Sequence, residues 1–236
     1  MNDKPLALIF GGSRGIGAAC VQALLRDGFD VAFTYVTTAP EVPLGTRAYA
    51  ADVRDASAVA QVFAAAKADF GRAPHAVVAN AGINVPPGPI AQFSDESFRQ
   101  LVEVNIVGAF NVLREAARQV ADGGAIVALT TSMVRIAVPG GGPYTATKAA
   151  VEAMVRSMSK ELAGRQVRVN AVAPGPVDTD LFRAGKTDEA KARSAALSPL
   201  GRIGRPEEVA DVVAFVVSGR ASWIDGQVIQ PNGAMV

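Results

Sequence analysis

The feature of this sequence that most limits its fold is a regular alternation of short apolar runs with longer helical stretches. Seven runs of four to six residues are rich in β-branched or small side chains, and most are apolar at consecutive positions. Strands that are apolar on both faces are typical of a parallel sheet covered by helices on both sides. The runs are 6–10, 31–35, 47–50, 76–79, 125–130, 167–172 and 227–230.

Helical patterns fill most of the intervals between these runs. We expect helices at 15–27, 56–70, 95–120, 144–163 and 206–218. The alternation predicts an α/β protein, a single domain over 1–236 with a doubly wound Rossmann fold and a parallel seven-stranded sheet with helices on both faces. The interval 36–46 differs, because two prolines and a glycine leave no room for an ordinary crossover helix. We expect an irregular loop there and an uncovered patch of sheet beside it.

Composition narrows the possible functions. The chain has 236 residues, half of them hydrophobic, and a formal net charge of +1 with Lys and Arg scattered along its length. This predicts no general attraction to nucleic acid or to an anionic membrane. No run is long and apolar enough for a signal peptide or a membrane span. The one cysteine, Cys20, rules out an internal disulfide and suits a reducing, cytoplasmic location.

A single histidine, His75, limits the chemistry further. With one histidine and one cysteine the chain has no ligand set for a zinc site of the usual kind. It also has no obvious base for a serine nucleophile. We therefore expect no metal.

A tyrosine and a lysine, Tyr144 and Lys148, lie four residues apart in the helix expected at 144–163, so both project from one face. The ordinary pKa of tyrosine is about 10, and a neighbouring ammonium group lowers it by favouring the phenolate. A tyrosine with a lowered pKa can exchange protons with a substrate. The same spacing also occurs in helices where both residues are ordinary surface side chains.

A glycine-rich turn directly follows the first run. Gly11, Gly15 and Gly17 have the spacing G-x-x-x-G-x-G at the point where a strand should lead into a helix. Without side chains, the backbone can bend sharply and let a pyrophosphate approach the free N–H groups and the positive dipole end of the helix. Taken alone, the pattern fits a cofactor site and a simple tight turn equally well.

The residues after the second run indicate which dinucleotide would bind. An acidic side chain about twenty positions beyond the glycines holds the ribose hydroxyls of NAD in many proteins. Here the run ends at Thr34 and Tyr35, with no carboxylate to repel a 2′-phosphate, and Arg14 in the glycine turn could bind one. We expect NADP(H) to be preferred, with NAD(H) still possible.

Taken together, these residues resemble the short-chain dehydrogenase/reductase family over nearly the whole chain, because further motifs follow in that family's order. The glycine turn is similar to the family's T-G-x-x-x-G-x-G, with Phe10 in place of the threonine. The remaining motifs are Asp52-Val53, Asn80-Ala81-Gly82, Asn105, Ser132, Tyr144, Lys148 and the stretch from Pro174 to Thr179.

The resemblance implies reversible hydride transfer between a nicotinamide cofactor and a small-molecule carbonyl or alcohol. The catalytic residues that it implies are Asn105, Ser132, Tyr144 and Lys148. Tyr144 would exchange the proton, Ser132 would hydrogen-bond the carbonyl oxygen, and Lys148 would bind the nicotinamide ribose and lower the tyrosine pKa. Asn105 would hold a water on a proton path from Lys148 to solvent. Thr131 is the alternative to Ser132, since it lies thirteen residues before the tyrosine, as the serine often does in the family.

The resemblance also implies a set of cofactor-binding residues. Asp52 would accept a hydrogen bond from the adenine amino group and Val53 would pack on the ring. Val177 and Thr179 would orient the nicotinamide carboxamide. The full set is Gly11, Ser13, Arg14, Gly15, Ile16, Gly17, Thr34, Asp52, Val53, Asn80, Ala81, Gly82, Tyr144, Lys148, Pro174, Gly175, Val177 and Thr179.

Substrate choice is expected to lie in the segment 181–205, which interrupts the strand–helix alternation and has the composition of a lid. Within it, basic residues outnumber acidic ones, which could attract an acyl thioester on an acidic carrier protein. The alternative function is therefore a 3-oxoacyl-carrier-protein reductase, which the chain also resembles. A nucleotide-sensing protein without catalysis is a third possibility. By resemblance, the assembly would be a homotetramer or a homodimer.

Overall fold

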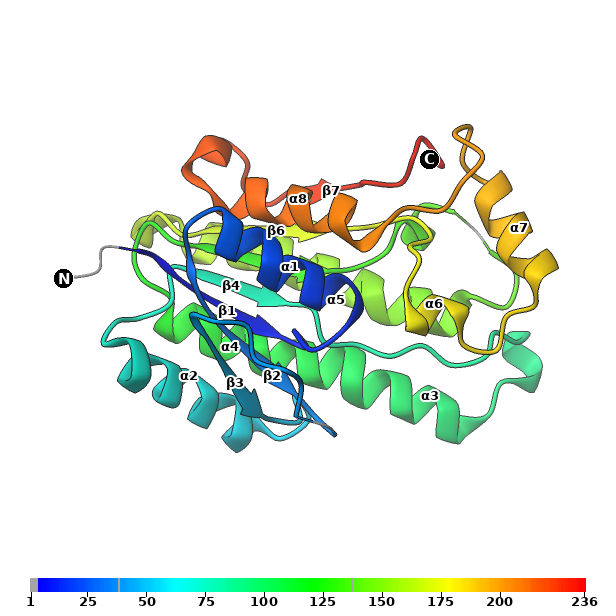
Figure 1. Cartoon of the computed structure of the whole chain (residues 1–236). Helices are drawn as coiled ribbons and strands as arrows, with labels where there is room; N and C mark the ends of the chain where they lie inside the picture. Colours follow the sequence, from blue (N-terminus) through cyan, green and yellow to red (C-terminus); the bar gives the residue numbers. More distant parts are fainter. Residues whose placement is uncertain (1–3, 38, 137) are drawn as a thin grey trace.

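The computed structural model describes residues 4–37, 39–136 and 138–236. Its strands form one parallel seven-stranded sheet in the order β3-β2-β1-β4-β5-β6-β7 (Figure 1). The strands are β1 (Leu6–Phe10), β2 (Asp30–Tyr35), β3 (Thr46–Ala50), β4 (Ala76–Ala79), β5 (Ala125–Leu129), β6 (Arg168–Val172) and β7 (Val228–Ile229). Each of the seven predicted runs forms a strand, and the predicted doubly wound Rossmann fold is confirmed. The strand order reverses beside β1, between β1 and β4, which is where such sheets bind nucleotides.

The predicted helices also form, with one change. The α-helices are α1 (Gly15–Arg26), α2 (Ala56–Phe70), α3 (Asp95–Val102), α4 (Ala109–Gln119), α5 (Gly142–Glu161), α6 (Asp180–Arg183), α7 (Asp188–Ala196) and α8 (Pro206–Val217). Short 3₁₀ turns lie at η1 (Ile90–Gln92), η3 (Ser132–Val134), η4 (Ala163–Arg165) and η5 (Gly219–Ala221). The helix expected over 95–120 is divided by a π-helix, η2 (Glu103–Gly108). In the described part of the chain, no helix combines the length and apolarity needed to cross a bilayer.

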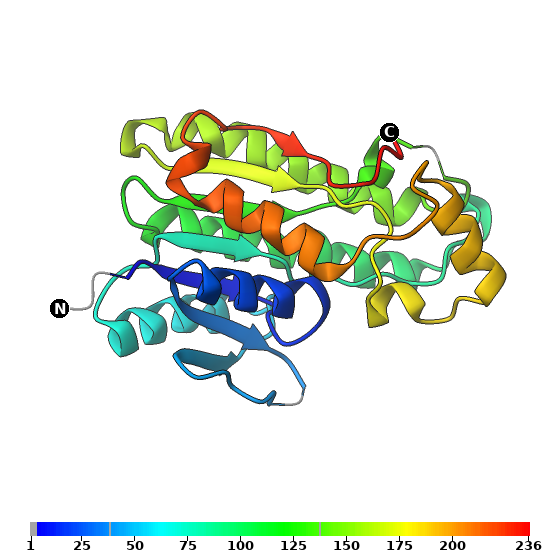
Figure 2. The same cartoon turned by 45° about the horizontal axis from the view of Figure 1, so that its top comes forward.

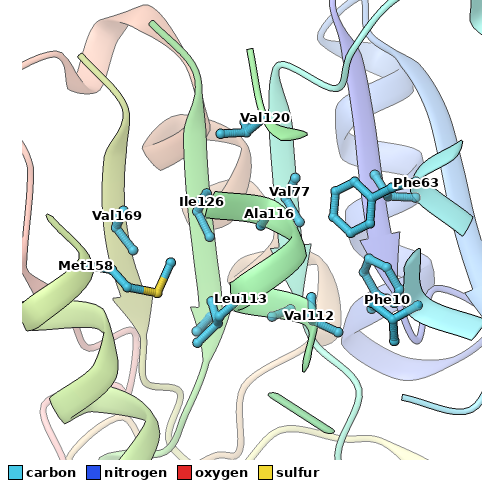
Figure 3. Close-up of a cluster of buried hydrophobic side chains, with 14 of the residues drawn as sticks. Phe10, Phe63, Val77, Val112, Leu113, Ala116, Val120, Ile126, Met158 and Val169 are labelled. Carbon is cyan, nitrogen blue, oxygen red and sulfur yellow. The ribbon is translucent and has the colours of Figure 1, made fainter. Parts of the chain in front are cut away.

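Helices cover both faces of the sheet (Figure 2), and two hydrophobic layers hold them there. On one face, α2, α4 and α5 pack on the strands through a cluster that includes Phe10, Phe63 and Ile126 (Figure 3). On the other face, α1 and α8 pack on side chains such as Ile9 and Val127. Alternate residues of one strand thus enter opposite layers, which explains why the central runs are apolar at every position.

The loop between β2 and β3 contains no helix in its described residues, as predicted. The crossover therefore leaves β3 without a helix on the face that α1 covers further along the sheet. Ala48 points toward this face, next to the α1 layer, and Ala50 is exposed. Small side chains expose little apolar surface, so the sequence reduces the cost of leaving this edge of the sheet uncovered.

Phe63 should be one of the largest single contributors to the stability of this fold. Its ring is fully buried, with its centroid 5.6 Å from that of Phe10. Phe63→Ala is expected to lower the free energy of unfolding by about 3–5 kcal/mol, through lost burial and the cavity left behind. Urea unfolding checks this, with Phe98→Ala as control because Phe98 is 46% exposed. Similar losses in the two variants would contradict the assignment of Phe63 to the core.

Candidate active site

The glycine turn between β1 and α1 has a backbone that only glycine fits. Gly11 and Gly15 have φ values of +79° and +55°, in the left-handed region that other residues rarely adopt. At Gly17, an added Cβ would lie 2.0 Å from the carbonyl oxygen of Gly11. The turn is therefore folded back on itself so tightly that the three glycines of the motif are structural requirements.

Side chains from two neighbouring strands hold this turn in place. The Thr34 hydroxyl, at the end of β2, accepts a hydrogen bond from the Gly11 N–H at 2.9 Å. The Asn80 side-chain amide, just after β4, donates to the Gly11 carbonyl at 2.7 Å. Phe10, which replaces the family's threonine, turns into the core instead, and its backbone carbonyl accepts from the Asn80 N–H at 3.2 Å. The link between the ends of β1 and β4 thus runs through Asn80.

Thr34 was expected to bind the cofactor, but the structure places its side chain inside the protein. Its side chain is only 1% exposed, and its oxygen already supports the glycine turn. It cannot reach a phosphate at the surface, so its effect on a ligand is indirect, through the shape of the turn. Sequence alone could not show this, because a threonine at a strand end can point inward or outward.

The N-terminal end of α1 has the features that an anionic group requires. The first three amides of the helix, at residues 15–17, have no acceptor within the described part of the chain. Arg14 occupies the N-cap position in an extended conformation, exposed and without a side-chain hydrogen bond to the helix. Ser13 and Ile16 are partly exposed beside it. These free N–H groups, together with the helix dipole, fit the pyrophosphate of a dinucleotide.

A pocket of about 380 Å³ opens between this turn and the start of the segment that follows β6. Gly15 lines it from α1, while Thr179, Asp180 and Arg183 line it from α6. A Cβ on Gly15 would lie 3.3 Å from the methyl group of Thr179. The glycine turn and the predicted lid therefore face a common space.

The motif residues Asp52 and Val53 follow β3. Asp52 is partly exposed, and both of its carboxylate oxygens accept hydrogen bonds from Arg54, which lowers the pKa of the Asp52 carboxyl. Val53 was expected to pack on an adenine ring, and that expectation is wrong for its side chain. The side chain is 4% exposed and lies against Gly108, where a Cβ would be 2.6 Å away.

Val177 was expected to orient the nicotinamide carboxamide, and that expectation is wrong for its side chain. Its side chain is 6% exposed and belongs to the α8 layer, so only its backbone can contact a carboxamide. Thr179 caps α6 by accepting a hydrogen bond from the Phe182 N–H at 3.1 Å. Val53 and Val177 are both apolar residues at strand or loop ends, and tertiary packing turns each side chain into the core.

Asn105 connects the π-helix to two other segments. Its side-chain oxygen accepts from the Ile83 N–H at 2.9 Å, and its amide donates to the Ile83 carbonyl at 2.9 Å and to the Thr147 hydroxyl at 3.2 Å. Both amide hydrogens are therefore used within the chain. A water on the predicted proton path would have to donate to the remaining lone pair of the side-chain oxygen, or bind at the backbone that the π-helix rearranges.

Gly82 brings Asn105 and Lys148 together. A Cβ at this position would lie 3.1 Å from Lys148 Nζ and 3.2 Å from Asn105 Oδ1, so the backbone approaches both groups closely. Lys148 Nζ donates to the Leu129 carbonyl at the end of β5, at 3.0 Å. Three of the expected residues thus meet at the carboxyl ends of β4 and β5.

Burial controls the pKa of both residues in the tyrosine–lysine pair. It lowers the pKa of the Lys148 ammonium to about 8, because the charged form is disfavoured away from water. It raises the pKa of the Tyr144 phenol to about 12, for the same reason. The tyrosine pKa was expected to fall because of the lysine, but the shift in this structure is upward and comes from desolvation. Tyr144 is protonated at neutral pH.

The two candidate hydroxyls after β5 have different partners. The Ser132 side chain is fully buried, donates to the Ala173 carbonyl at 2.7 Å and accepts from the Asn232 amide at 3.1 Å. Its single proton is thus already used in the hydrogen bond to Ala173, the residue directly after β6. The Thr131 oxygen accepts from the Met133 N–H at 3.3 Å, which leaves its own proton free in the described structure.

Comparison with known proteins agrees with this geometry. A family model described as enoyl-(acyl carrier protein) reductase matches residues 11–235. A short-chain type dehydrogenase/reductase from Picea abies is 39% identical, and the match covers 98% of this chain and 92% of the relative. The chain belongs to the short-chain dehydrogenase/reductase family.

Other relatives agree with the family assignment. An NADPH-dependent aldehyde reductase-like chloroplastic protein of Arabidopsis thaliana is 38% identical, over 98% of this chain and 94% of its own. Among solved structures, a short-chain dehydrogenase/reductase from Serratia marcescens has a TM-score of 0.90 and 31% identity, covering 100% of this chain and 99% of its own. A blue fluorescent protein from a metagenomic library, in complex with NADPH, has a TM-score of 0.91 and 29% identity, covering all of both chains.

Two residues in this short-chain dehydrogenase/reductase were missed by motif reasoning. Asn232 reaches back from the C-terminal tail to Ser132, and Glu152 is a carboxylate only 2% exposed on α5. Asn232 gave no sequence signal, because it is a hundred residues from its partner. Glu152 could have been recognised from the sequence, since it is a charged residue one helical turn beyond Lys148 in the otherwise apolar stretch AAVEAMV.

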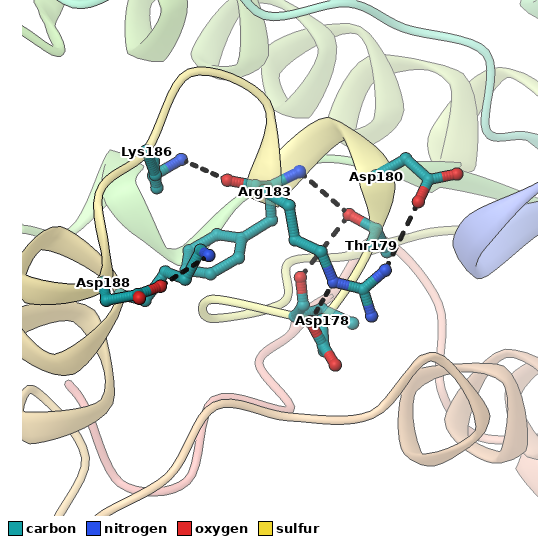
Figure 4. A network of polar contacts seen from close by, with 9 residues as sticks. Asp178, Thr179, Asp180, Arg183, Lys186 and Asp188 are labelled. Carbon is teal, nitrogen blue, oxygen red and sulfur yellow. Dashed lines mark hydrogen bonds and ion pairs between the residues drawn. The ribbon is translucent and has the colours of Figure 1, made fainter.

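The segment after β6 is held by ion pairs that its basic residues make (Figure 4). Arg183 Nε donates to Asp178 at 2.8 Å and its Nη1 donates to Asp180 at 3.3 Å. Lys186 Nζ lies 4.3 Å from the ring centroid of Phe182 and donates to the carbonyl of the same residue. Two of the basic side chains that stood out in the sequence, Arg183 and Lys186, therefore have partners close by.

The low pKa of Lys148 predicts a pH effect on stability. Its folded pKa of about 8 lies below the ordinary lysine value of 10.5, so the folded state binds fewer protons and becomes more stable as pH rises through this interval. Relative to Lys148→Met, wild type should gain about 2–3 kcal/mol in free energy of unfolding between pH 7 and pH 10.

Urea unfolding at several pH values measures this difference. Other titrating groups, including Tyr144, are present in both proteins and cancel when the two are subtracted. A difference that stays constant with pH, or that falls, would show that Lys148 is not desolvated in the folded chain.

Proposed function

We propose that this chain is an NADP(H)-dependent carbonyl reductase that acts on a small molecule, reversibly, with Tyr144 as the proton donor. The supporting observation is the position of Lys148. Its buried ammonium lies at the carboxyl ends of β4 and β5, beside Gly82 and one helical turn from Tyr144. Among the described residues, no carboxylate pairs with this desolvated ammonium, so a structural ion pair there does not explain its burial.

The protonation state of Tyr144 suits the reduction of a carbonyl group. A phenol with a raised pKa carries its proton at neutral pH, and so it can donate to a carbonyl oxygen. A bound nicotinamide would supply the hydride that adds to the carbonyl carbon. Lys148 is mostly protonated at pH 7, so its positive charge is close by when the phenol releases its proton and becomes negative. Asn105 holds the segment of Ile83 and the helix α5 in register around these two groups.

Thr131 is the hydroxyl that we assign to the carbonyl oxygen of the substrate, in place of Ser132. A hydroxyl has one proton, and that of Ser132 goes to Ala173. Donation by Ser132 to a substrate would require breaking a buried hydrogen bond. The Thr131 proton is free in the described structure, and the residue lies two positions after Leu129, the end of β5, whose carbonyl binds Lys148.

Three observations support NADP(H) as the preferred dinucleotide. Arg14 is exposed at the glycine turn, and β2 ends without a carboxylate that would repel a 2′-phosphate. The similar Arabidopsis proteins are named as NADPH-dependent reductases. The metagenomic blue fluorescent protein was solved with NADPH. Binding of NAD(H) with lower affinity stays compatible with the same cleft.

The segment 181–205 is the part of the chain that we assign to substrate selection. It lies beyond the carboxyl ends of the strands, where Figure 1 shows α6 and α7. Near its start, Arg183 also lines the pocket that opens at the glycine turn. The excess of basic residues within this segment does not favour a carrier protein, because four acidic residues directly flank it, and residues 178–208 together hold six basic and six acidic side chains. A simple carbonyl compound therefore fits better than an acyl chain on an acidic carrier. A homodimer or homotetramer and a cytoplasmic location remain predictions.

A carbonyl panel with NADPH and with NADH tests the function. Wild type should oxidise NADPH in the presence of aldehydes or ketones, more efficiently than NADH, as followed by absorbance. Tyr144→Phe should lose activity by about 10²–10⁴-fold, because it removes the proton donor. Tyr49→Phe is a matched control, since the Tyr49 hydroxyl bonds the exposed Asp69. Full activity of Tyr144→Phe would refute the mechanism, and binding of NADPH without any turnover by wild type would indicate a sensor.

A pair of variants separates the two hydroxyls. Thr131→Val should lower kcat by about 10²-fold, because the developing negative charge on the carbonyl oxygen loses a hydrogen bond. Ser132→Ala should leave more of the activity but lower the free energy of unfolding by about 1–3 kcal/mol, since Ala173 and Asn232 lose a buried partner. Steady-state kinetics and urea unfolding of both variants measure this. The reverse pattern would restore Ser132 as the catalytic residue.

A further inference from the structure

Glu152 is a buried carboxylate that the proposed reaction does not use. Its side chain is 2% exposed on α5, and it accepts hydrogen bonds from Thr130 Oγ1, at 3.1 Å, and from Arg135 Nη1. We propose that Glu152 is a positioning residue, which fixes the segment carrying Thr131 against the helix carrying Tyr144 and Lys148. This inference rests on the proposed function, and in particular on the role of Thr131.

The two partners of Glu152 lie on either side of the catalytic hydroxyl. Thr130 comes directly before Thr131 at the end of β5, and Arg135 follows four residues after it, just beyond the 3₁₀ turn η3. Because one carboxylate binds both, it closes the segment 130–135 into a loop with α5 as its base. The segment cannot slide along the helix without breaking both contacts.

Glu152 also stands in a fixed relation to the proton donor. Tyr144, Lys148 and Glu152 are spaced by four residues, so they follow one another along the same face of α5. Lys148 binds the Leu129 carbonyl and Glu152 binds the Thr130 hydroxyl, so two successive turns of α5 hold the last residue of β5 and the residue directly after it. This arrangement sets the distance between the Thr131 hydroxyl and the Tyr144 phenol, which must contact the same carbonyl oxygen.

Another buried carboxylate shows what a purely local role looks like. Glu115 on α4 is 6% exposed, and its oxygens accept from Arg118 at 2.7 Å and from Gln119 at 2.9 Å. Both partners belong to its own helix, so Glu115 stabilises α4 without connecting it to another element. Glu152 has both of its side-chain partners outside α5 and on the segment that contains Thr131.

The test compares Glu152→Gln with Glu115→Gln in the full chain. Glu152→Gln should lower kcat for carbonyl reduction by about 10- to 100-fold, because a small displacement of a catalytic group is sufficient for that loss. Its Kd for NADPH should change by less than about twofold, since the glycine turn and residues 80–82 are untouched. Glu115→Gln should leave both kcat and the Kd for NADPH near wild type, whatever its effect on Tm.

A readout without turnover keeps this test separate from the proposed function. The amides of Ser132, Val134 and Arg135 donate to Pro174, Thr131 and Ser132, respectively. Their hydrogen exchange should be faster in Glu152→Gln than in wild type, and unchanged in Glu115→Gln. If wild type reduces no carbonyl compound, the proposed function fails, and the exchange rates still decide whether Glu152 holds the segment.

Two outcomes would overturn the inference. One is unchanged kcat and unchanged exchange in Glu152→Gln. The other is an equal loss of kcat and of NADPH affinity, which a general loss of structure would produce. If Glu152→Gln does not fold, Thr130→Val removes one of the two contacts and keeps the ion pair. It should lower kcat by about 3- to 10-fold without a change in NADPH affinity, and wild-type kcat in that variant would also overturn the inference.

Discussion

The structure of the site depends on the close approach of the short segment after β4 to the glycine turn after β1. Asn80 holds the Gly11 carbonyl, and a Cβ on Gly11 would lie 2.9 Å from the Ala81 Cα. Two residues after Asn80, a Cβ added at Gly82 would lie 3.1 Å from Lys148 Nζ and 3.2 Å from Asn105 Oδ1. Three consecutive residues therefore connect the half of the site that suits a pyrophosphate to the half that holds the proton-transfer groups. Larger side chains at positions 11, 17 or 82 would separate these halves.

Around this contact, the chain buries polar side chains that each join two elements. Asn105 ties the π-helix to Ile83 and Thr147, Ser132 ties the 3₁₀ turn η3 to Ala173, and Glu152 ties α5 to Thr130. Burying such groups costs stability unless each is hydrogen-bonded, and here each of them has partners. Since a directional bond fixes geometry better than an apolar contact, these groups determine where the catalytic side chains stand, while the two hydrophobic layers provide most of the stability.

Much of this could be predicted from the sequence, and the failures have a common cause. The strands, the helix-free loop between β2 and β3, the glycine turn and the tyrosine–lysine pair were read from local patterns, since each depends on residues near in sequence. The inward orientation of Thr34 and Val53 was not, and neither were the hydrogen-bond partners of Thr131 and Ser132. The predicted fall in the Tyr144 pKa was wrong, because burial raises it to about 12. Each failure concerns what surrounds a side chain in space.

The sequence by itself determined the alternation of strands and helices, the tight turn at Gly11 to Gly17 and the four-residue spacing that puts Tyr144, Lys148 and Glu152 on one helical face. These follow from backbone geometry and from the periodicity of side chains, which act over a few residues. Only the tertiary structure decided which hydroxyl keeps a free proton, how deeply Lys148 is buried, and that Asn232 meets Ser132 across a hundred residues. Desolvation and hydrogen-bond pairing depend on neighbours that the fold brings together from distant parts of the chain.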